Sequence, residues 1–292
     1  MKGILIFNKP KGITSHDVVY ILRRKTGIKR IGHTGTLDPL AEGVLPMCIG
    51  KATKVAEYIS ADTKEYIARL EFGYETDTYD ITGTTTKTTD YIPTIEEVRS
   101  ILKEFTGEIL QEPPMYSALK HNGKKLYELA REGITVERKK RKITISNLEI
   151  LNIISDKEIE IKVNCSSGTY IRSLVRDMGI ALNSLCTMTA LKRTQVGNYK
   201  IEDSITKEEL DLMSLEELEE KIISMDTALS DLEEFILPEW FYNRAINGVQ
   251  FILKKNVEEK LYRVYCNNEF LGIGEVVTKD SDQRLKIKKL LL

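Results

Sequence analysis

The sequence predicts an α+β protein with a mixed, mostly antiparallel sheet flanked by helices, followed by a small β-rich C-terminal domain. Residues 66–73 and 158–165 alternate apolar and polar side chains with a period of two, which is typical of half-buried strands. A helix-capping pattern, as at residues 94–97, occurs between such segments. Further along, an acidic helical pattern gives way to short strands, which predicts domains at 1–235 and 236–292.

The N-terminal elements follow from apolar periodicity and from turn residues. Residues 4–7 form an apolar run that predicts a strand, and the turn-rich residues 8–12 end it. Ser15 is expected to cap a helix that ends at Gly27. Residues 30–47 contain several glycines and prolines and predict a loop. The other expected elements are helices at 51–59, 94–104 and 124–132, a helix from the turn at 166–169 to residue 182, strands at 66–73, 143–152, 158–165 and 190–196, acidic amphipathic segments at 206–213 and 215–223, and strands at 261–265, 269–277 and 284–290.

The net charge of −1 conceals an uneven distribution of charged side chains. Residues 1–60 contain ten Lys and Arg side chains against four acids, and residues 116–142 contain nine more Lys and Arg side chains. The acids gather between residues 202 and 234. A basic face with a segregated acidic segment can bind a polyanion such as nucleic acid despite a near-neutral sum. Such basic runs also occur on ordinary solvated surfaces, so composition alone leaves both interpretations open.

The composition is that of a globular protein, with 41% hydrophobic and 30% charged residues. The four cysteines are scattered without a C-x-x-C pair and there are only three histidines, so we expect reduced thiols and no metal site. No apolar run approaches the roughly 20 residues of a membrane span, and the first residues do not form a secretory signal. We therefore expect a cytoplasmic protein.

The densest chemical signal is the segment 32–46, which contains three glycines and two prolines. Asp38 lies in this segment between Leu37 and Pro39. A carboxylate held rigidly beside apolar neighbours is a candidate nucleophile or general base. An aspartate that precedes a proline is also common in ordinary turns. The loop by itself leaves both interpretations open.

Three further segments carry weaker signals. Tyr66 begins an alternating strand, where its ring could stack on a base and its hydroxyl could take part in proton transfer. Arg172 lies where a strand turns into a helix, and it could pair with a carboxylate or bind a phosphate. Residues 191–197 form a basic and apolar strand. A tyrosine at the edge of the core and a surface arginine are the structural alternatives.

Taken in order, these motifs resemble the TruB family of tRNA pseudouridine synthases, which act on uridine 55 in the T arm. The resemblance covers about residues 3–200. Glu42 is a departure, since this position is often small or uncharged in the family. The residues that carry the resemblance are Asn8-Lys9-Pro10-x-Gly12-x-Thr14-Ser15, Gly32-His33-x-Gly35-Thr36-Leu37-Asp38-Pro39-Leu40-Ala41-x-Gly43-Val44-Leu45-Pro46, Lys64-x-Tyr66, Thr76-Asp77-Thr78-x-Asp80-x-x-Gly83, Pro113-Pro114-x-Tyr116-Ser117-Ala118, Gly168-Thr169-Tyr170-Ile171-Arg172-Ser173-Leu174 and Leu191-x-Arg193-Thr194-x-Val196-Gly197.

The resemblance implies a pseudouridine-synthase-like catalytic domain and a short PUA-like C-terminal domain. It implies that Asp38 is the catalytic carboxylate and that Arg172 pairs with it and keeps it ionised. Tyr66 would stack on the flipped base and serve in proton removal from C5. The resemblance further implies a set of substrate-binding residues, which are His33, Tyr170, Leu191, Lys9, Lys192 and Arg193.

Within this set the expected contributions differ. Tyr170 and Leu191 would line the pocket of the flipped base. His33 would occupy space that the base leaves in the opened T loop. Lys9 is expected to buttress the aspartate loop more than to touch substrate, whereas residues 192–193 would approach the RNA backbone and the basic residues of 116–142 would contact stem phosphates.

The implied reaction cleaves the N1–C1′ glycosidic bond, rotates the base and rejoins it through C5, which requires no cofactor. Asp38 either attacks C1′ or removes a C2′ proton, and the sequence leaves the two routes open. The expected partner is the T arm of tRNA, bound by a monomer that needs no protein partner. One alternative is an RNA-binding or RNA-folding protein without catalysis, and both activities could coexist in one chain. Another is a carboxylate-dependent glycosidase or nucleosidase, which would usually need a second acid, and Glu42 is the only nearby candidate for it.

Overall fold

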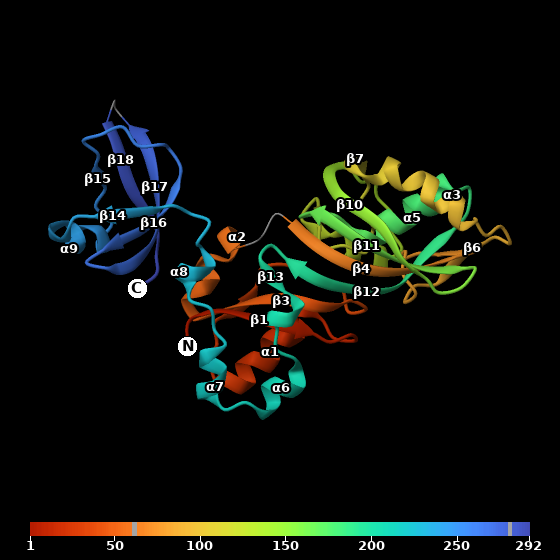
Figure 1. The fold of residues 1–292 in the computed structure, drawn as a ribbon, viewed down its shortest axis with the longest axis horizontal. Helices are drawn as coiled ribbons and strands as arrows, with labels where there is room; N and C mark the ends of the chain where they lie inside the picture. Colours follow the sequence, from red (N-terminus) through yellow and green to blue (C-terminus); the bar gives the residue numbers. More distant parts are fainter. Residues whose placement is uncertain (60–62, 280–281) are drawn as a thin grey trace.

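The computed structural model describes residues 1–59, 63–279 and 282–292 and contains two main sheets (Figure 1). The larger sheet has nine strands in the order β1-β3-β12-β4-β11-β10-β7, with β2 paired to β3 and β13 paired to β12. Its pairs are antiparallel except β3 and β12, which are parallel. The predicted mixed, mostly antiparallel sheet is confirmed. Its strands are β1 (Gly3–Lys9), β2 (Ile31–His33), β3 (Glu42–Ile49), β4 (Thr63–Phe72), β7 (Gly107–Gln111), β10 (Arg141–Ile153), β11 (Glu158–Ser166), β12 (Cys186–Val196) and β13 (Tyr199–Lys200).

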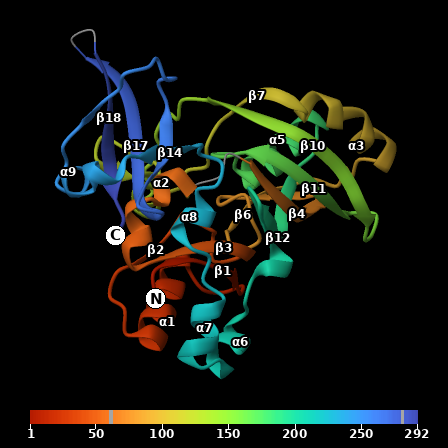
Figure 2. The ribbon, with the colours of Figure 1, turned by 60° about the vertical axis from the view of Figure 1, so that its left-hand side comes forward.

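Helices flank this sheet in two groups that Figures 1 and 2 both show. In Figure 1, the helices α1 (Ser15–Thr26), α6 (Lys207–Leu212) and α7 (Leu215–Glu220) lie below β1 and β3. The helices α3 (Ile95–Ile101) and α5 (Ile171–Ala181) lie beside the other half, near β10 and β11. The shorter elements are α2 (Ala56–Ile59), α4 (Leu126–Arg131), α8 (Met225–Ala228), α9 (Tyr242–Ile246), and two hairpins formed by β5 (Tyr74–Thr76) with β6 (Thr85–Thr88) and by β8 (Lys120–His121) with β9 (Lys124–Lys125).

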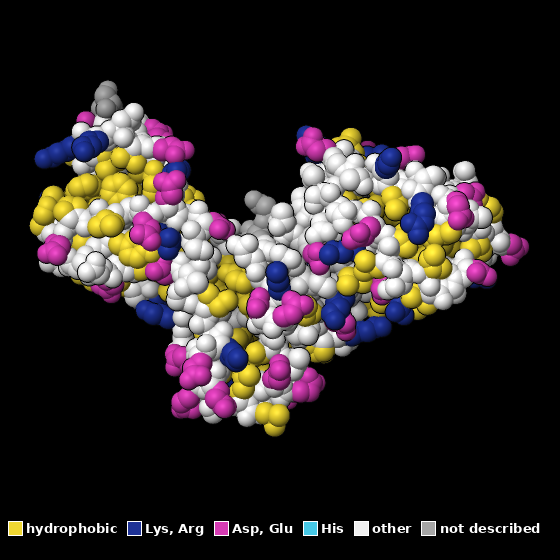
Figure 3. All heavy atoms as spheres, in the orientation of Figure 1, with side chains coloured by type: hydrophobic (Ala, Val, Ile, Leu, Met, Phe, Trp, Pro, Cys, Tyr) yellow, Lys and Arg dark blue, Asp and Glu magenta, His cyan; other side chains and the backbone are white. Residues whose placement is uncertain are grey.

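A second sheet lies apart from the first, at the left of Figure 1, and a hollow separates the two lobes in Figure 3. Its strand order is β14-β16-β17-β18-β15, and it has a hydrophobic cluster of its own. This sheet confirms the expected small β-rich C-terminal part. Within the described residues, no helix is long and apolar enough to cross a membrane. The strands are β14 (Glu234–Leu237), β15 (Phe251–Ile252), β16 (Leu261–Cys266), β17 (Glu269–Lys279) and β18 (Asp282–Leu290).

Acidic side chains are concentrated at the lower end of the molecule in Figure 3, where α6 and α7 lie. Both helices begin with an acidic first turn, which is favourable beside the positive end of the helix dipole. The acidic side chains of α6 and α7 thus lie together at this end of the molecule.

The expectation of a loop over 30–47 is wrong at both ends, because β2 covers Ile31–His33 and β3 begins at Glu42. Residues 44–49 are a continuous apolar run that is buried, and such a run suits a central strand. Pro46 has no N–H to donate to a neighbouring strand. Its carbonyl faces the side of β2 and accepts the Thr34 N–H. The pairing of β2 with β3 ends just before it, at His33 and Met47, so the missing N–H costs no ladder hydrogen bond. Gly43 and Pro46 therefore lie within the strand and do not indicate a loop.

The start of the first helix also differs from the prediction. Thr14, and not Ser15, caps α1, because its side chain accepts the N–H of Asp17 in a reciprocal capping box. Gly27 ends the helix in the left-handed conformation, as expected. Residues 51–59 form a 3₁₀ turn and the short α2 instead of one helix.

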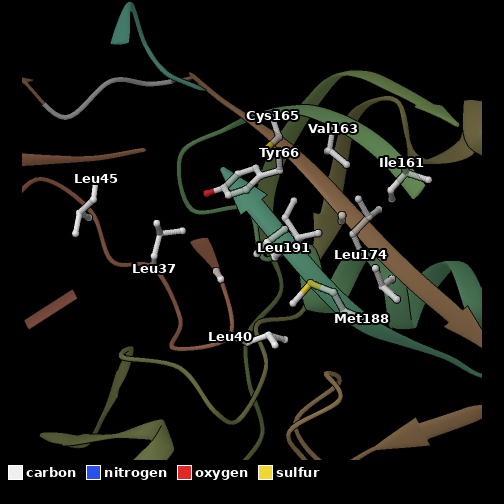
Figure 4. Close-up of a cluster of buried hydrophobic side chains, with 14 of the residues drawn as sticks. Leu37, Leu40, Leu45, Tyr66, Ile161, Val163, Cys165, Leu174, Met188 and Leu191 are labelled. Carbon is white, nitrogen blue, oxygen red and sulfur yellow. The ribbon is translucent and has the colours of Figure 1, made fainter. Parts of the chain in front are cut away.

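The strand β4 confirms the predicted alternation, since Tyr66, Ala68, Leu70 and Phe72 are all buried. These side chains join a core cluster with residues of β11, α5 and β12, part of which is drawn in Figure 4. Tyr66 lies at one end of this cluster, and its hydroxyl points towards the segment that carries Leu37 and Leu45. The core thus places the head of β4 beside the loop between β2 and β3.

Candidate active site

The loop that carries Asp38 is fixed to the start of α1 by hydrogen bonds. The buried hydroxyl of Ser15 donates to the carbonyl of Leu37 (3.1 Å) and accepts the N–H of the same residue (2.8 Å). The N–H of Gly12 donates to the carbonyl of Pro39 (2.7 Å). These bonds satisfy backbone groups on both sides of Asp38, so the carboxylate projects from a rigid support.

Arg172 forms an ion pair with the carboxylate of Asp38. It lies in the first turn of α5, its side chain is 6% exposed, and its Nη2 lies 2.7 Å from Oδ2 of Asp38, whose side chain is 37% exposed. The same nitrogen donates to the carbonyl of Tyr116 (3.0 Å), and Nη1 donates to the carbonyl of Thr78 (3.1 Å). Nε lies 3.6 Å from Oδ2 of Asp80. The guanidinium is therefore held in one orientation by four acceptors, with Asp38 at its solvent side.

Asp80 is a buried residue of the motif at 76–83, and no role was predicted for it. Its Oδ1 accepts the N–H of Thr82 (3.0 Å) and the hydroxyl of Thr78 (3.0 Å) in a tight turn. Gly83 completes this turn, because a Cβ there would lie 2.4 Å from Oδ1 of Asp77. The motif at residues 76–83 was the available signal, and the structure shows that it places a second carboxylate behind Arg172.

A cavity of about 250 Å³ lies beside Asp38. Tyr66 is 7% exposed, and this burial raises the pKa of its phenol, while the positive charge of Arg193 acts in the opposite direction. The phenol is therefore protonated at neutral pH. Burial also raises the pKa of Tyr170. The cavity is lined by Thr36, Leu37, Asp38, Lys64, Tyr66, Ser117, Ala118, Gly168, Thr169, Tyr170, Ile171, Arg172 and Leu191.

Five of the predicted site residues thus line one cavity, namely Asp38, Tyr66, Tyr170, Arg172 and Leu191. They come from the β2–β3 loop, from β4, from the start of α5 and from β12, which are far apart in the sequence. No role was predicted for the polar lining residues Lys64, Ser117 and Thr169. All three lie in or beside quoted motifs, but nothing in their residue types distinguishes them from ordinary polar positions.

The other four predicted site residues do not line this cavity. Lys9 is fully buried, and its ammonium donates to the carbonyls of Pro10 (2.9 Å) and Ile13 (2.7 Å). Burial lowers the pKa of Lys9 to about 8. His33 is partly buried, and burial lowers the pKa of its imidazole. The two basic residues of β12 differ in burial, since Lys192 is half-buried and Arg193 is only 1% exposed.

Among residues 1–59, 63–279 and 282–292, no cluster of three or more His, Cys, Asp or Glu side chains could hold a metal ion. The four cysteines are buried and free. Burial raises the pKa of Cys48 to about 12 and that of Cys165 to about 11, so these thiols are unreactive. The lining of the cavity offers a carboxylate, an arginine, a lysine, two phenols and the hydroxyls of Thr36, Ser117 and Thr169.

This fold and this site define the class of the protein. The chain in the "Crystal Structure of a Cbf5-Nop10-Gar1 Complex" has a similar fold, with a TM-score of 0.73 and 24% identity over 99% of this chain and 85% of that one. The chain in the "Structure of H/ACA RNP bound to a substrate RNA containing 2'-deoxyuridine" has a TM-score of 0.74 and 22% identity over 99% and 85%. The architecture is the pseudouridine synthase fold.

Comparison of the sequence is more specific. The model of the TruB family pseudouridylate synthase N-terminal domain matches residues 23–171, and that of the tRNA pseudouridylate synthase B C-terminal domain matches residues 172–238. The tRNA pseudouridine synthase B of Clostridium kluyveri is 46% identical over 297 residues, which cover 100% of both chains. The enzyme of the same name from Fusobacterium nucleatum is 45% identical over 284 residues, which cover 94% of this chain and 96% of that one. The chain belongs to the TruB family of pseudouridylate synthases and is an enzyme of that class, as its motifs predicted.

Proposed function

We propose that this enzyme isomerises uridine 55 in the T arm of tRNA to pseudouridine, with Asp38 as the catalytic carboxylate. The observation that carries the proposal is the 2.7 Å contact between Asp38 and the buried Arg172 at the wall of a cavity. The relatives that match over the full chain are named tRNA pseudouridine synthase B. Their name and the geometry of this site support the same reaction.

The reaction is balanced without a co-reactant. The N1–C1′ bond breaks, a C5–C1′ bond forms, C5 loses its proton and N1 gains one. Because C1′ is inaccessible in a stacked loop, the uridine is first flipped out of the RNA. The cavity of about 250 Å³ is smaller than the usual pocket for a drug-sized ligand and suits a single base.

The residues at the cavity have different roles in the reaction. Asp38 either attacks C1′ or removes a C2′ proton, and its contact with Arg172 orients the carboxylate in both routes. The ring of Tyr66 stacks on the flipped base, and its hydroxyl serves in proton removal from C5. Tyr170 and Leu191 form the apolar walls. Lys9 supports the aspartate loop from below by occupying the carbonyls at the start of α1.

The RNA is held outside the cavity by charge. Exposed cations such as Lys139, Lys140 and Arg141 contact the stem phosphates, which gives a salt-dependent affinity. His33 is the last residue of β2, where the aspartate loop begins, and it holds the opened T loop. Lys192 approaches the RNA backbone. Residues 1–235 form the catalytic domain, and residues 236–292 form a PUA-like domain that adds RNA contacts. The enzyme acts as a monomer in the cytoplasm, and flipping of the base lets it also assist tRNA folding.

The test is pseudouridine formation at the T-arm position of an unmodified tRNA transcript. The parent is expected to form pseudouridine, and Asp38→Asn, which keeps the shape of the side chain, is expected to bind the RNA without isomerising it. Asp156→Asn is the matched control, because it neutralises an exposed acid outside the cavity lining. Released uracil would identify a glycosidase, and tight binding with unchanged RNA would identify a protein that only binds or folds RNA. Either result from the parent would refute the proposal.

A further inference from the structure

The guanidinium of Arg193 connects the two ends of the loop that carries Asp38. Its Nε donates to the carbonyl of Val44 (2.8 Å), which follows the loop. Its Nη1 donates to the carbonyl of Thr36 (3.4 Å), which precedes Asp38. Arg193 is 1% exposed and is among the largest fully buried side chains. A planar, forked donor can hold two carbonyls at a fixed separation, so this side chain sets the distance across the base of the loop.

The backbone of the same residue adjoins two other parts of the site. In the sheet, Arg193 lies opposite Tyr66 of β4 on one side and opposite Gly43 of β3 on the other. The approach to Gly43 is so close that a Cβ there would lie 2.1 Å from the carbonyl oxygen of Arg193. One residue of β12 therefore lies between the strand that carries the phenol and the strand that continues from the aspartate loop.

The charge of Arg193 also acts within the site. Among the described residues, no carboxylate forms an ion pair with this guanidinium. Its Nε and Nη1 donate to loop carbonyls, and within the same described part of the chain its buried Nη2 has no hydrogen-bond partner. Its positive charge lowers the pKa of Tyr66, against the larger effect of burial. Figure 4 shows the Tyr66 hydroxyl pointing towards the segment that carries Leu37 and Leu45, which are neighbours of Thr36 and Val44. The buried side chain of Arg193 cannot reach an RNA backbone, so its expected role as a backbone contact is wrong.

We propose that Arg193 is a positioning residue, which fixes the Asp38 loop and the Tyr66 phenol relative to each other. The inference rests on the proposed function, because it assigns a role within that reaction. Displacement of catalytic groups by about 1 Å can cost roughly 100-fold in rate without weakening substrate binding. Arg193 therefore contributes to kcat and not to the affinity for RNA.

The experiment compares Arg193→Lys and Arg193→Met with the parent on a T-arm hairpin. Lysine keeps the charge but cannot span both carbonyls, so we expect kcat to fall about 10-fold, and about 100-fold for the methionine variant. The Kd for the hairpin should change less than about 2-fold. Arg263→Lys is the matched control, since its arginine is also largely buried but contacts Leu232, Asp226 and Glu234 near the second sheet. It should keep the parental kcat.

A second readout tests the coupling to Tyr66 directly. With 3-fluorotyrosine at position 66, the ¹⁹F resonance should titrate at a higher pH in Arg193→Met than in the parent, whereas Arg193→Lys should stay close to the parent. A merely structural role would not produce this difference. If the methionine variant does not fold, the lysine variant decides through kcat and Kd.

Three results would overturn the inference: a parental kcat in Arg193→Lys, a loss that appears wholly in Kd, or an unchanged Tyr66 titration in a folded Arg193→Met. The outcome remains separable from the proposed function. If the parent itself does not isomerise the hairpin, the proposed function fails, and the Tyr66 titration still decides whether Arg193 controls the phenol.

Discussion

Replacement of Arg172 by lysine is the sharpest perturbation of the proposed mechanism. The guanidinium meets four acceptors through three nitrogens: Asp38, Asp80 and the carbonyls of Thr78 and Tyr116. A lysine keeps the positive charge, but its single nitrogen cannot occupy these positions together. Because Asp80 is buried and the bonds to the carbonyls of Thr78 and Tyr116 are part-buried, we expect the ammonium to stay with these three acceptors and the 2.7 Å contact with Asp38 to be lost.

The size of the effect follows from that one contact. A hydrogen bond to a charged group contributes about 1.5–3 kcal/mol, and each ~1.4 kcal/mol changes a rate about tenfold. The side chain of Asp38 is 37% exposed, so water weakens the contact and the lower part of this range applies. We therefore expect kcat of Arg172→Lys to fall about 10- to 30-fold. Binding of the RNA should change little, because Arg172 is 6% exposed.

The assay is single-turnover pseudouridine formation on a T-arm hairpin at saturating enzyme, with Kd measured separately. Arg99→Lys, on the exposed face of α3, is the control for the chemical change and should behave as the parent. Thermal unfolding checks that the variant is folded at the assay temperature. A parental rate in folded Arg172→Lys would show that orientation of Asp38 by the guanidinium is irrelevant to the reaction.

Three further predictions concern residues around the cavity. Tyr66→Phe keeps the ring and removes the hydroxyl, so kcat should fall about 100-fold while Kd is retained, and equal losses in both would refute a role in proton transfer. Gly43→Ala should lower the free energy of unfolding in urea by about 2–5 kcal/mol, because φ is +110° and the Cβ would lie 2.1 Å from a carbonyl oxygen; an unchanged midpoint would contradict this. Lys9 has a pKa of about 8 in the folded protein against an ordinary 10.5, so the unfolded chain binds more protons between these values. The stability of the parent relative to Lys9→Met should accordingly rise by up to about 3 kcal/mol from pH 8 to pH 10.5, and a flat difference would show that the ammonium is not buried.

The elements with a strong period could be predicted from the sequence. The alternation in β4 and β11 placed Tyr66 and its neighbours on a buried face, and the structure confirms it. β3 was missed because Gly43 and Pro46 are ordinarily strand breakers. Their compatibility with a strand depends on the close approach of β12 to the first and on the end of β2 beside the second. Both are tertiary facts that a single segment does not carry.

The candidate site, too, was predictable only where a local motif carried the information. The family resemblance implied that Asp38 and Arg172 form a pair, and the structure brings them within 2.7 Å. Asp80 received no role, because an acid in a threonine-rich turn has the ordinary function of a turn residue. Its proximity to Arg172 arises from a contact between residues separated by 92 positions along the chain, which no local pattern reveals.

Lys9 was expected to buttress the aspartate loop more than to touch substrate, whereas Arg193 was expected to approach the RNA backbone, since an arginine is seldom buried. In the structure both are buried, and both donate to backbone carbonyls at or beside the aspartate loop. A loop without regular hydrogen bonding must still satisfy its carbonyls, and long cationic side chains can do so from beneath without occupying the cavity. The cavity side of the loop is then left to Arg172 and to substrate. The basic side chains of the enzyme therefore have two different roles. The exposed ones are available to phosphates, and the buried ones, Lys9 and Arg193, hold the loop that carries the Asp38 carboxylate in place.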